Sequence, residues 1–169
     1  MRHHALLPLI VGILALALGG LVYVADRNPA MSMLMPAGGA TPHGSLFGAA
    51  GSILPSFAHT LAFSLFAATV PPPVARPRYG ACAFWCAVNL AFELGQHPLL
   101  SAPLSVALRH AADALPAARA GFEALSFYFL RGTFDWGDIA ATFVGAGAAA
   151  CLLWWNQPER DGRPKRSTR

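Results

Sequence analysis

Charged residues are scarce in this sequence. Asp, Glu, Lys and Arg together make up 12% of the 169 residues, while 55% are hydrophobic. Soluble domains carry roughly 25% charged residues, and here the apolar residues also gather into long runs. This combination excludes an ordinary soluble domain and predicts a small integral membrane protein with one compact membrane domain.

Cysteine is scarce too, and its placement excludes a disulfide framework. Cys82, Cys86 and Cys151 all lie inside apolar runs, where small buried cysteines serve as apolar packing residues. Cys82 and Cys86 share a helix face, so a metal or redox role is the alternative. Three methionines alternate between positions 31 and 35, and such thioethers can bind Cu(I), but no Cys or His stands between them. We therefore predict no metal and no cofactor.

Four apolar runs have about the 20 residues that a helix needs to cross a membrane. They cover residues 5–24, 53–70, 79–96 and 137–155. The first run could be a cleaved secretory signal, but it is long for one and no small-x-small cleavage site follows it. The sequence thus predicts an all-α fold, a four-helix integral membrane bundle within residues 1–155, followed by a basic tail at 156–169.

The segment 98–130 is too polar and too broken to span a membrane. Leucines recur at helical spacing from Leu100 onward, with Ser101 before Pro103 as a start signal. A second apolar stripe runs from Leu115 to Phe129. We predict two short amphipathic helices lying in the membrane interface between the third and fourth spans. The alternative is that the second helix packs on the bundle as a lid.

Basic residues predict the orientation in the membrane. The net charge is +4, and five of the twelve Lys and Arg residues lie in the last ten positions. With the N-terminus inside, eight of the twelve fall on the inner side and four on the outer side. By the positive-inside rule, both termini are cytoplasmic. The basic balance is a topology signal and does not predict nucleic-acid binding.

Polar groups on three of the spans are predicted to meet at the outer end of the bundle. His59, Glu93, Gln96 and Asp138 share one depth, and Arg131 and Asp135 stand just above them. Charged groups at membrane depth are costly, so they indicate a functional site and favour pairing, for example of Arg131 with Glu93 or Asp138. One alternative is that Asp138 caps its helix and Arg131 snorkels to lipid head groups. A second is a purely structural clasp, in which the polar groups set the register of the helices without chemistry.

Three fragments of the sequence, SFAHTLAFSLF, NLAFELGQ and RGTFDWGDIAATFVGAGA, resemble the VanZ-like family of small bacterial membrane proteins. The positions that match the family pattern are His59, Glu93, Gln96, Arg131, Asp135, Asp138 and Gly145. The chain departs from that pattern at Thr142, where the family commonly has Asn, at Pro55 and Ser56, and in the length of the 97–130 link. The resemblance implies a multi-pass protein of the bacterial cytoplasmic membrane, and the family namesake is linked to teicoplanin resistance.

Two functional hypotheses follow. In the first, the protein binds a membrane lipid or a lipid-linked envelope precursor at the outer leaflet, with Arg131 contacting an anionic head group, and it affects susceptibility to glycopeptide antibiotics. The alternative is a membrane-embedded hydrolase or transferase in which His59 is the base and Glu93 or Asp138 its partner. A proton-coupled transporter is disfavoured because the ionisable groups gather at one end. We favour the first hypothesis. The sequence does not indicate whether the protein is a monomer or an oligomer.

Overall fold

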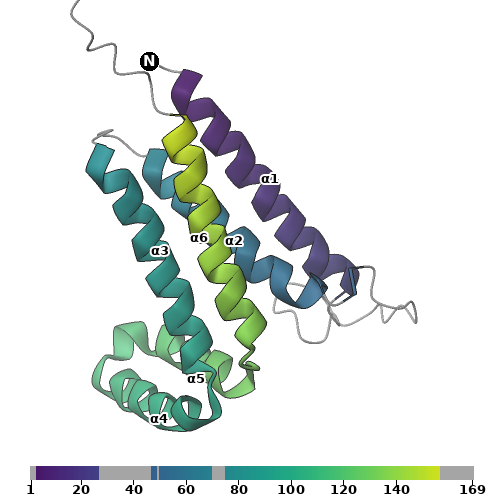
Figure 1. Cartoon of the computed structure of the whole chain (residues 1–169). Coiled ribbons are helices and arrows are strands. Elements are labelled where there is room, and N and C mark those ends of the chain that lie inside the picture. The colour runs from purple at the N-terminus through teal and green to yellow at the C-terminus, as the bar shows by residue number, and fades with distance from the viewer. Residues whose placement is uncertain (1–2, 27–46, 49, 70–74, 157–169) are drawn as a thin grey trace, which may run out of the picture.

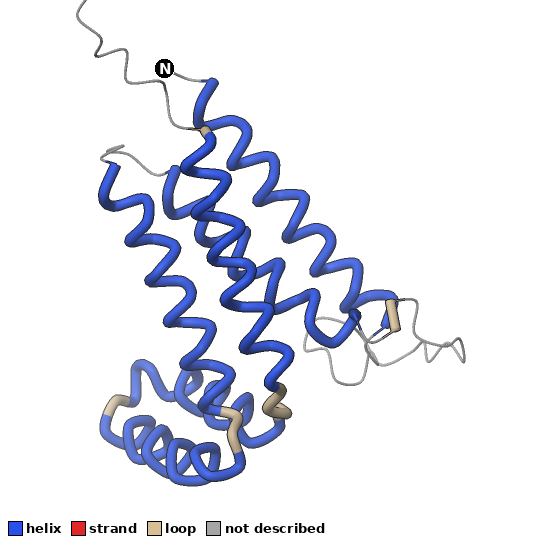
Figure 2. Tube along the Cα trace, viewed as in Figure 1, coloured by secondary structure: helices blue, strands red, loops and turns tan. Residues whose placement is uncertain are grey.

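The computed structural model describes residues 3–26, 47–48, 50–69 and 75–156, and this part of the chain is helical without strands (Figures 1 and 2). The long helices are α1 (His3–Asp26), α2 (Ala50–Thr69), α3 (Ala75–Gly95) and α6 (Trp136–Trp155). Between α3 and α6 lie α4 (Pro98–Ala114), the short 3₁₀ helix η2 (Pro116–Ala118) and α5 (Arg119–Arg131). The all-α prediction is therefore confirmed for the described residues.

Three helices are long and apolar enough to cross a membrane. These segments are Leu6–Ala25, Ala50–Thr69 and Trp136–Trp155, which matches the predicted spans 5–24, 53–70 and 137–155. The fourth predicted span, 79–96, falls on α3, which ends one residue earlier at Gly95 and packs beside α2 and α6. This helix carries Arg76, Arg78 and Glu93 and is less apolar than the other three, so it is not among the candidate spans.

Helix α2 lies in the middle of the helix packing and contacts α1, α3 and α6 (Figure 1). The shared core contains mostly small and branched apolar residues, namely Ala15, Leu61, Ala62, Leu65, Ala68, Cys82, Ala149 and Leu153. Outward positions on the candidate spans stay exposed although they are large and apolar, as at Leu14, Val24 and Val144. Exposed apolar surface of this kind suits a lipid environment and not water.

Glycine lets α2 and α6 approach closely. A Cβ added at Gly145 would lie 2.7 Å from the carbonyl oxygen of Phe57 and 3.2 Å from Cβ of Thr60. One added at Gly137 would lie 2.7 Å from the Ile53 side chain. From the Gly137 contact to the Gly145 contact, the residue numbers increase on both helices, so α2 and α6 run parallel. Their backbones nearly touch at Gly145. Small residues at such contacts are typical of packed membrane helices.

Helices α4 and α5 form a hairpin across one end of α3 and α6, called here the hairpin end (Figure 1). The two predicted amphipathic helices within 98–130 are therefore confirmed as helices. The first begins one turn earlier than Ser101, because His97 is its N-cap and accepts a hydrogen bond from the Leu99 N–H at 3.3 Å. The hydroxyls of Ser105 and Ser126 lie 2.6 Å apart in the buried seam between α4 and α5.

The first residues of α1 and the last residues of α6 lie at the end opposite the hairpin (Figure 1). The described ends of α1 and α6 therefore lie at the same end of the bundle. Which side is cytoplasmic stays a prediction. The alternating methionines at 31–35 and the basic tail beyond Asn156 lie outside the described residues.

Candidate functional site

Asp138 is a buried carboxylate held between two parallel helices. It is 8% exposed, and its Oδ1 accepts a hydrogen bond of 2.7 Å from the hydroxyl of Ser56 on α2. Asp138 does not cap α6, because Asp135 is the N-cap and accepts a hydrogen bond of 2.7 Å from the Gly137 N–H. The capping alternative for Asp138 was therefore wrong: Asp135 satisfies the helix end, and Asp138 turns inward.

Gln96 joins the end of α3 to the hairpin. Its amide nitrogen donates to the hydroxyl of Tyr128 at 2.8 Å and to the carbonyl of Phe92 at 3.4 Å. The backbone of Gly132 packs directly against the Gln96 side chain, so any Cβ there would collide with it. Gln96 is consequently buried, at 8% exposure, and its orientation is set by contacts from two sides.

The pKa of the Tyr128 hydroxyl on the hairpin is raised by burial and by the carboxylates of Glu93 and Asp138. Burial is the largest cause that raises the pKa of its hydroxyl, to about 12, and the nearby Glu93 carboxylate is the next. Asp138 and Tyr23 contribute in the same direction, while the Gln96 hydrogen bond opposes them. Negative charge near a phenol disfavours its ionisation. The pKa of Tyr128 therefore responds to both Glu93 and Asp138, while the hydrogen bond of its hydroxyl is to Gln96.

His59 lies three residues beyond Ser56 on α2 and is half-buried among aromatic rings. Its ring stacks on Phe63 with centroids 6.0 Å apart and lies 6.4 Å from the ring of Tyr23 on α1. Three residues of helix correspond to about 4.5 Å along the axis, so His59 sits less than one turn from the Asp138–Ser56 pair. The contacts join Asp138 to Ser56 and Gln96 to Tyr128, while His59 faces the rings of Tyr23 and Phe63; that His59, Glu93, Gln96 and Asp138 act as one group stays a prediction.

Arg131 and Asp135 lie outside this buried group. Both side chains belong to exposed residues. The Arg131 guanidinium carbon lies 4.3 Å from the centre of the Phe127 ring. This cation–π contact leaves the Arg131 side chain exposed at the end of α5, and its pairing with Glu93 or Asp138 stays a prediction. The Asp135 carboxylate caps the N-terminus of α6, where it accepts the hydrogen bond from the Gly137 N–H.

We call the buried polar cluster, after its two buried members Gln96 and Asp138, the set Ser56, His59, Glu93, Gln96, Tyr128 and Asp138; Ser56, His59 and Glu93 are half-buried, and Tyr128 is 41% exposed. It draws on α2, α3, α5 and α6. Among the described residues, no group of three or more His, Cys, Asp and Glu side chains is placed to hold a metal ion. The arrangement can accept and donate hydrogen bonds to a polar ligand through carboxylate, amide, hydroxyl and imidazole groups.

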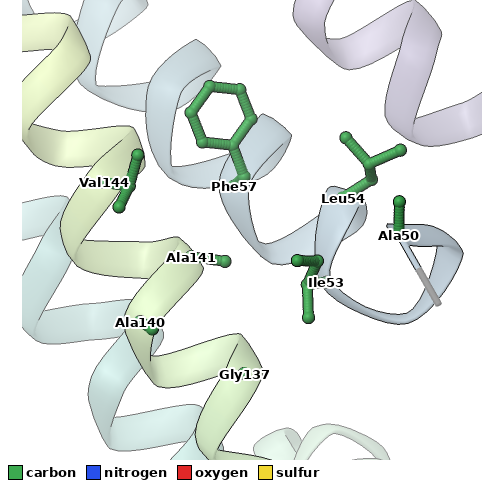
Figure 3. A pocket seen from close by; sticks show the side chains of 8 residues that line it. All are labelled: Ala50, Ile53, Leu54, Phe57, Gly137, Ala140, Ala141 and Val144. Atoms are coloured by element: carbon green, nitrogen blue, oxygen red, sulfur yellow. The ribbon is translucent and has the colours of Figure 1, made fainter.

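An apolar groove lies directly beside the buried polar cluster, between α2 and α6 (Figure 3). Its volume is about 440 Å³. The lining residues are Ala50, Ile53, Leu54, Phe57, Gly137, Ala140, Ala141 and Val144. Gly137 and Phe57 are the sequence neighbours of Asp138 and Ser56, but neither member of this polar pair lines the groove.

Sequence reasoning missed Ser56 and Tyr128 as members of the cluster. Ser56 was noted only as a departure from the family pattern, although it stands less than one turn from His59 on α2. Tyr128 follows the apolar stripe of α5 without any signal of its own, and only the folding of the hairpin back onto Gln96 reveals its contact. A stripe of small residues at Gly137, Ala140 and Ala141 was the available signal for the groove.

Comparison with known proteins does not identify the chain: no protein-family model, no curated protein and no solved structure matches it. The resemblance to the VanZ-like family therefore stays a prediction that depends on the matching residues alone.

Proposed function

We propose that this chain is a VanZ-like membrane protein of the bacterial cell envelope that binds the head group of an amphiphilic or lipid-linked ligand in its buried polar cluster. The observation that carries the proposal is the Asp138–Ser56 hydrogen bond at the end of two candidate membrane spans. Ionisable groups at such positions are costly and mark functional sites by default. Gln96 and Tyr128 add neutral hydrogen-bonding groups from α3 and α5.

The membrane supplies the ligand in this proposal. Helix α3 crosses the bilayer as a fourth span, with Glu93 near the outer surface, and both termini are cytoplasmic. The α4–α5 hairpin then lies at the outer interface, where its exposed Leu99, Leu100 and Phe127 meet the lipid. A ligand that reaches the cluster from this side carries both an apolar part and a polar head, which favours an amphiphile over a soluble metabolite.

Arg131 acts at the rim of the site and not inside it. Its guanidinium is exposed over Phe127, so it meets an anionic group outside the cluster, such as a phosphate at the level of the membrane surface. The buried groups are then left to recognise the uncharged or hydroxylated part of the head group. In this arrangement Arg131 attracts the ligand, and Glu93 and Asp138 select it.

The test is antibiotic susceptibility measured together with protein abundance. Wild type, Glu93→Gln and Asp138→Asn are expressed in a teicoplanin-susceptible bacterium, and inhibitory concentrations of teicoplanin and vancomycin are compared with membrane levels of each protein. We expect wild type to raise the teicoplanin concentration, and the abundant variants to lose this effect. If wild type gives no protection, the proposed envelope function is wrong. If both variants vanish from the membrane, the cluster is a structural clasp.

A further inference from the structure

Arg78 is a half-buried cation near the start of α3, and the first residues of α3 lie at the end of the bundle opposite the hairpin (Figure 1). Its Nε atom is buried and has no hydrogen-bond partner among the described residues. The Arg78 carbonyl accepts a hydrogen bond of 3.6 Å from the thiol of Cys82, a core residue on the same face of α3. Arg78 therefore stands on the core-facing side of α3, one turn nearer the end of the bundle. A buried donor of a charged group is costly when it stays unsatisfied, so Arg78 requires an acceptor.

The acidic side chains that the structure describes cannot supply this acceptor. They lie at the end of α3, on the hairpin and at the start of α6, namely Glu93, Asp113, Glu123, Asp135 and Asp138. Glu93, on the same helix as Arg78, is about 22 Å further along the axis. This separation is well beyond the screening length of about 8 Å at physiological ionic strength. The first turn of α3 holds no acidic residue either.

Exposed aromatic side chains indicate that this end of the bundle lies at a membrane surface. Tyr79, next to Arg78, is 38% exposed, and Trp154 and Trp155, at the end of candidate span α6, are 69% and 85% exposed. Tyr and Trp are enriched at the level of the lipid head groups. The acceptors available to a guanidinium at this level are lipid phosphates, which arginine binds through two parallel N–H bonds.

We propose that Arg78 binds the phosphate of an anionic phospholipid in the leaflet opposite the hairpin, with Nε and one terminal nitrogen donating to two phosphate oxygens. This site lies at the other end of the bundle from the buried polar cluster and does not depend on the proposed function. Snorkelling of Arg78 to water would hydrate its terminal nitrogens and leave the buried Nε unsatisfied, whereas the two-bond contact uses it. The sequence places a second cation, Arg76, in the first turn of α3, which favours an anionic lipid over a zwitterionic one.

The test measures binding of phosphatidylglycerol to the purified full-length protein in mild detergent by native mass spectrometry. Arg78→Gln removes the charge, Arg78→Lys keeps the charge without the Nε donor, and the control Arg109→Gln removes an exposed cation of α4 at the hairpin end. We expect Arg78→Gln to weaken binding about tenfold or more, and Arg78→Lys nearly as much, because a charge-assisted hydrogen bond is lost in both. Arg109→Gln should bind as wild type does.

Equal affinity in all four proteins overturns the proposal, and so does an equal loss in Arg109→Gln, which would mean that only the overall charge matters. Helical circular dichroism in the same detergent checks that each variant is folded. If Arg78→Gln does not fold, Arg78→Lys decides, because it keeps the charge and the apolar stem. Wild-type affinity in a folded Arg78→Lys would show that the Nε donor is not used.

Competitors identify the source of the phosphate. Diacylglycerol, which lacks the phosphate, and inorganic phosphate, which lacks the acyl chains, should both fail to displace phosphatidylglycerol. Displacement by inorganic phosphate would mean a site for a soluble anion and would overturn the lipid proposal. Phosphatidylcholine should bind more weakly than phosphatidylglycerol, and equal binding would contradict recognition of an anionic lipid.

The tail beyond the described residues carries two carboxylates, Glu159 and Asp161. The double variant Glu159→Gln/Asp161→Asn should bind phosphatidylglycerol as wild type does, since in this proposal the lipid is the partner of Arg78. If binding depends on Arg78 in the double variant but not in wild type, a tail carboxylate is the partner of Arg78 and the proposal is wrong.

Discussion

The hydroxyl of Ser56 and the carboxylate of Asp138 are 82 residues apart in sequence and 2.7 Å apart in the structure. The bond fixes the register of α2 against α6 at the hairpin end. Its donor is a neutral hydroxyl, whereas the basic side chain nearest in sequence, Arg131, lies outside over Phe127. A carboxylate positioned in this way can hold two helices together and also offer an acceptor to a ligand.

Removing the donor should destabilise the bundle modestly. Ser56→Ala is expected to lower the free energy of unfolding by about 1–2 kcal/mol, because a buried carboxylate loses a hydrogen bond while interhelical bonds in membrane proteins are individually small. Unfolding is followed by helical circular dichroism as SDS is titrated into mixed micelles. In a double-mutant cycle, Ser56→Ala should cost less in the Asp138→Asn background. Fully additive losses would mean that the two side chains are not coupled.

Gly145 and Gly147 provide a matched pair of substitutions on α6. Gly145→Ala should destabilise the bundle by about 1–3 kcal/mol, because the new methyl group meets the Phe57 carbonyl at 2.7 Å. Gly147→Ala meets nothing within 4 Å, so the better helix propensity of Ala should leave stability equal or slightly higher. The same SDS titration measures both. Equal effects at the two positions would contradict the close contact between α2 and α6.

Tyr128 should make stability depend on pH in the alkaline range. Its folded pKa is raised to about 12, above its ordinary value of 10.0, so the unfolded chain releases this proton at lower pH than the folded protein does. The contribution of the neutral phenol is fully present below pH 10 and is lost as the pH rises towards 12. Tyr128→Phe should therefore lose less stability than wild type between pH 10 and 12, measured by thermal unfolding. Identical pH profiles would show that the phenol is not in this environment.

Ser105 and Ser126 should hold the hairpin together. Ser105→Ala leaves the Ser126 hydroxyl in a buried seam without the partner at 2.6 Å, and we expect a loss of about 1–2 kcal/mol. Ser101→Ala, one turn earlier on α4, should have little effect. Amide hydrogen exchange of α4 and α5 reports the local change, because opening of the hairpin exposes these amides. Unchanged exchange in Ser105→Ala would contradict the prediction.

Much of the fold could be predicted because apolar length and helical spacing are local properties. The runs 5–24, 53–70 and 137–155 follow directly from composition, and α4 and α5 follow from their spaced leucines and phenylalanines. Helix α4 begins about one turn before the start signal predicted at Ser101. The reason is that His97 is the N-cap and its ring nitrogen accepts a hydrogen bond from the Leu99 N–H. Helix α3, predicted as a span, is not among the candidate spans, since two arginines and Glu93 make it less apolar than the other long helices.

The site could be predicted only in part because it depends on contacts between distant segments. Common depth predicts that His59, Glu93, Gln96 and Asp138 meet at one end, and this stays a prediction. Depth cannot show which way a side chain points, so Asp138 was weighed as a cap, although its carboxylate accepts a hydrogen bond from Ser56 and Asp135 is the N-cap. Tyr128 became part of the cluster only because the hairpin folds back onto Gln96.

The most direct test of the central claim is whether the purified protein retains an amphiphile through its buried carboxylates. Wild type, Glu93→Gln, Asp138→Asn and the control Gly147→Ala are purified in mild detergent, and bound amphiphiles are identified by mass spectrometry alongside the thermal stability of each protein. We predict that wild type and Gly147→Ala retain one class of amphiphile in near-stoichiometric amount, and that the two carboxylate variants lose it while staying folded. Equal retention in all four proteins, or the same non-selective lipid mixture in each, would contradict a ligand site at Glu93 and Asp138.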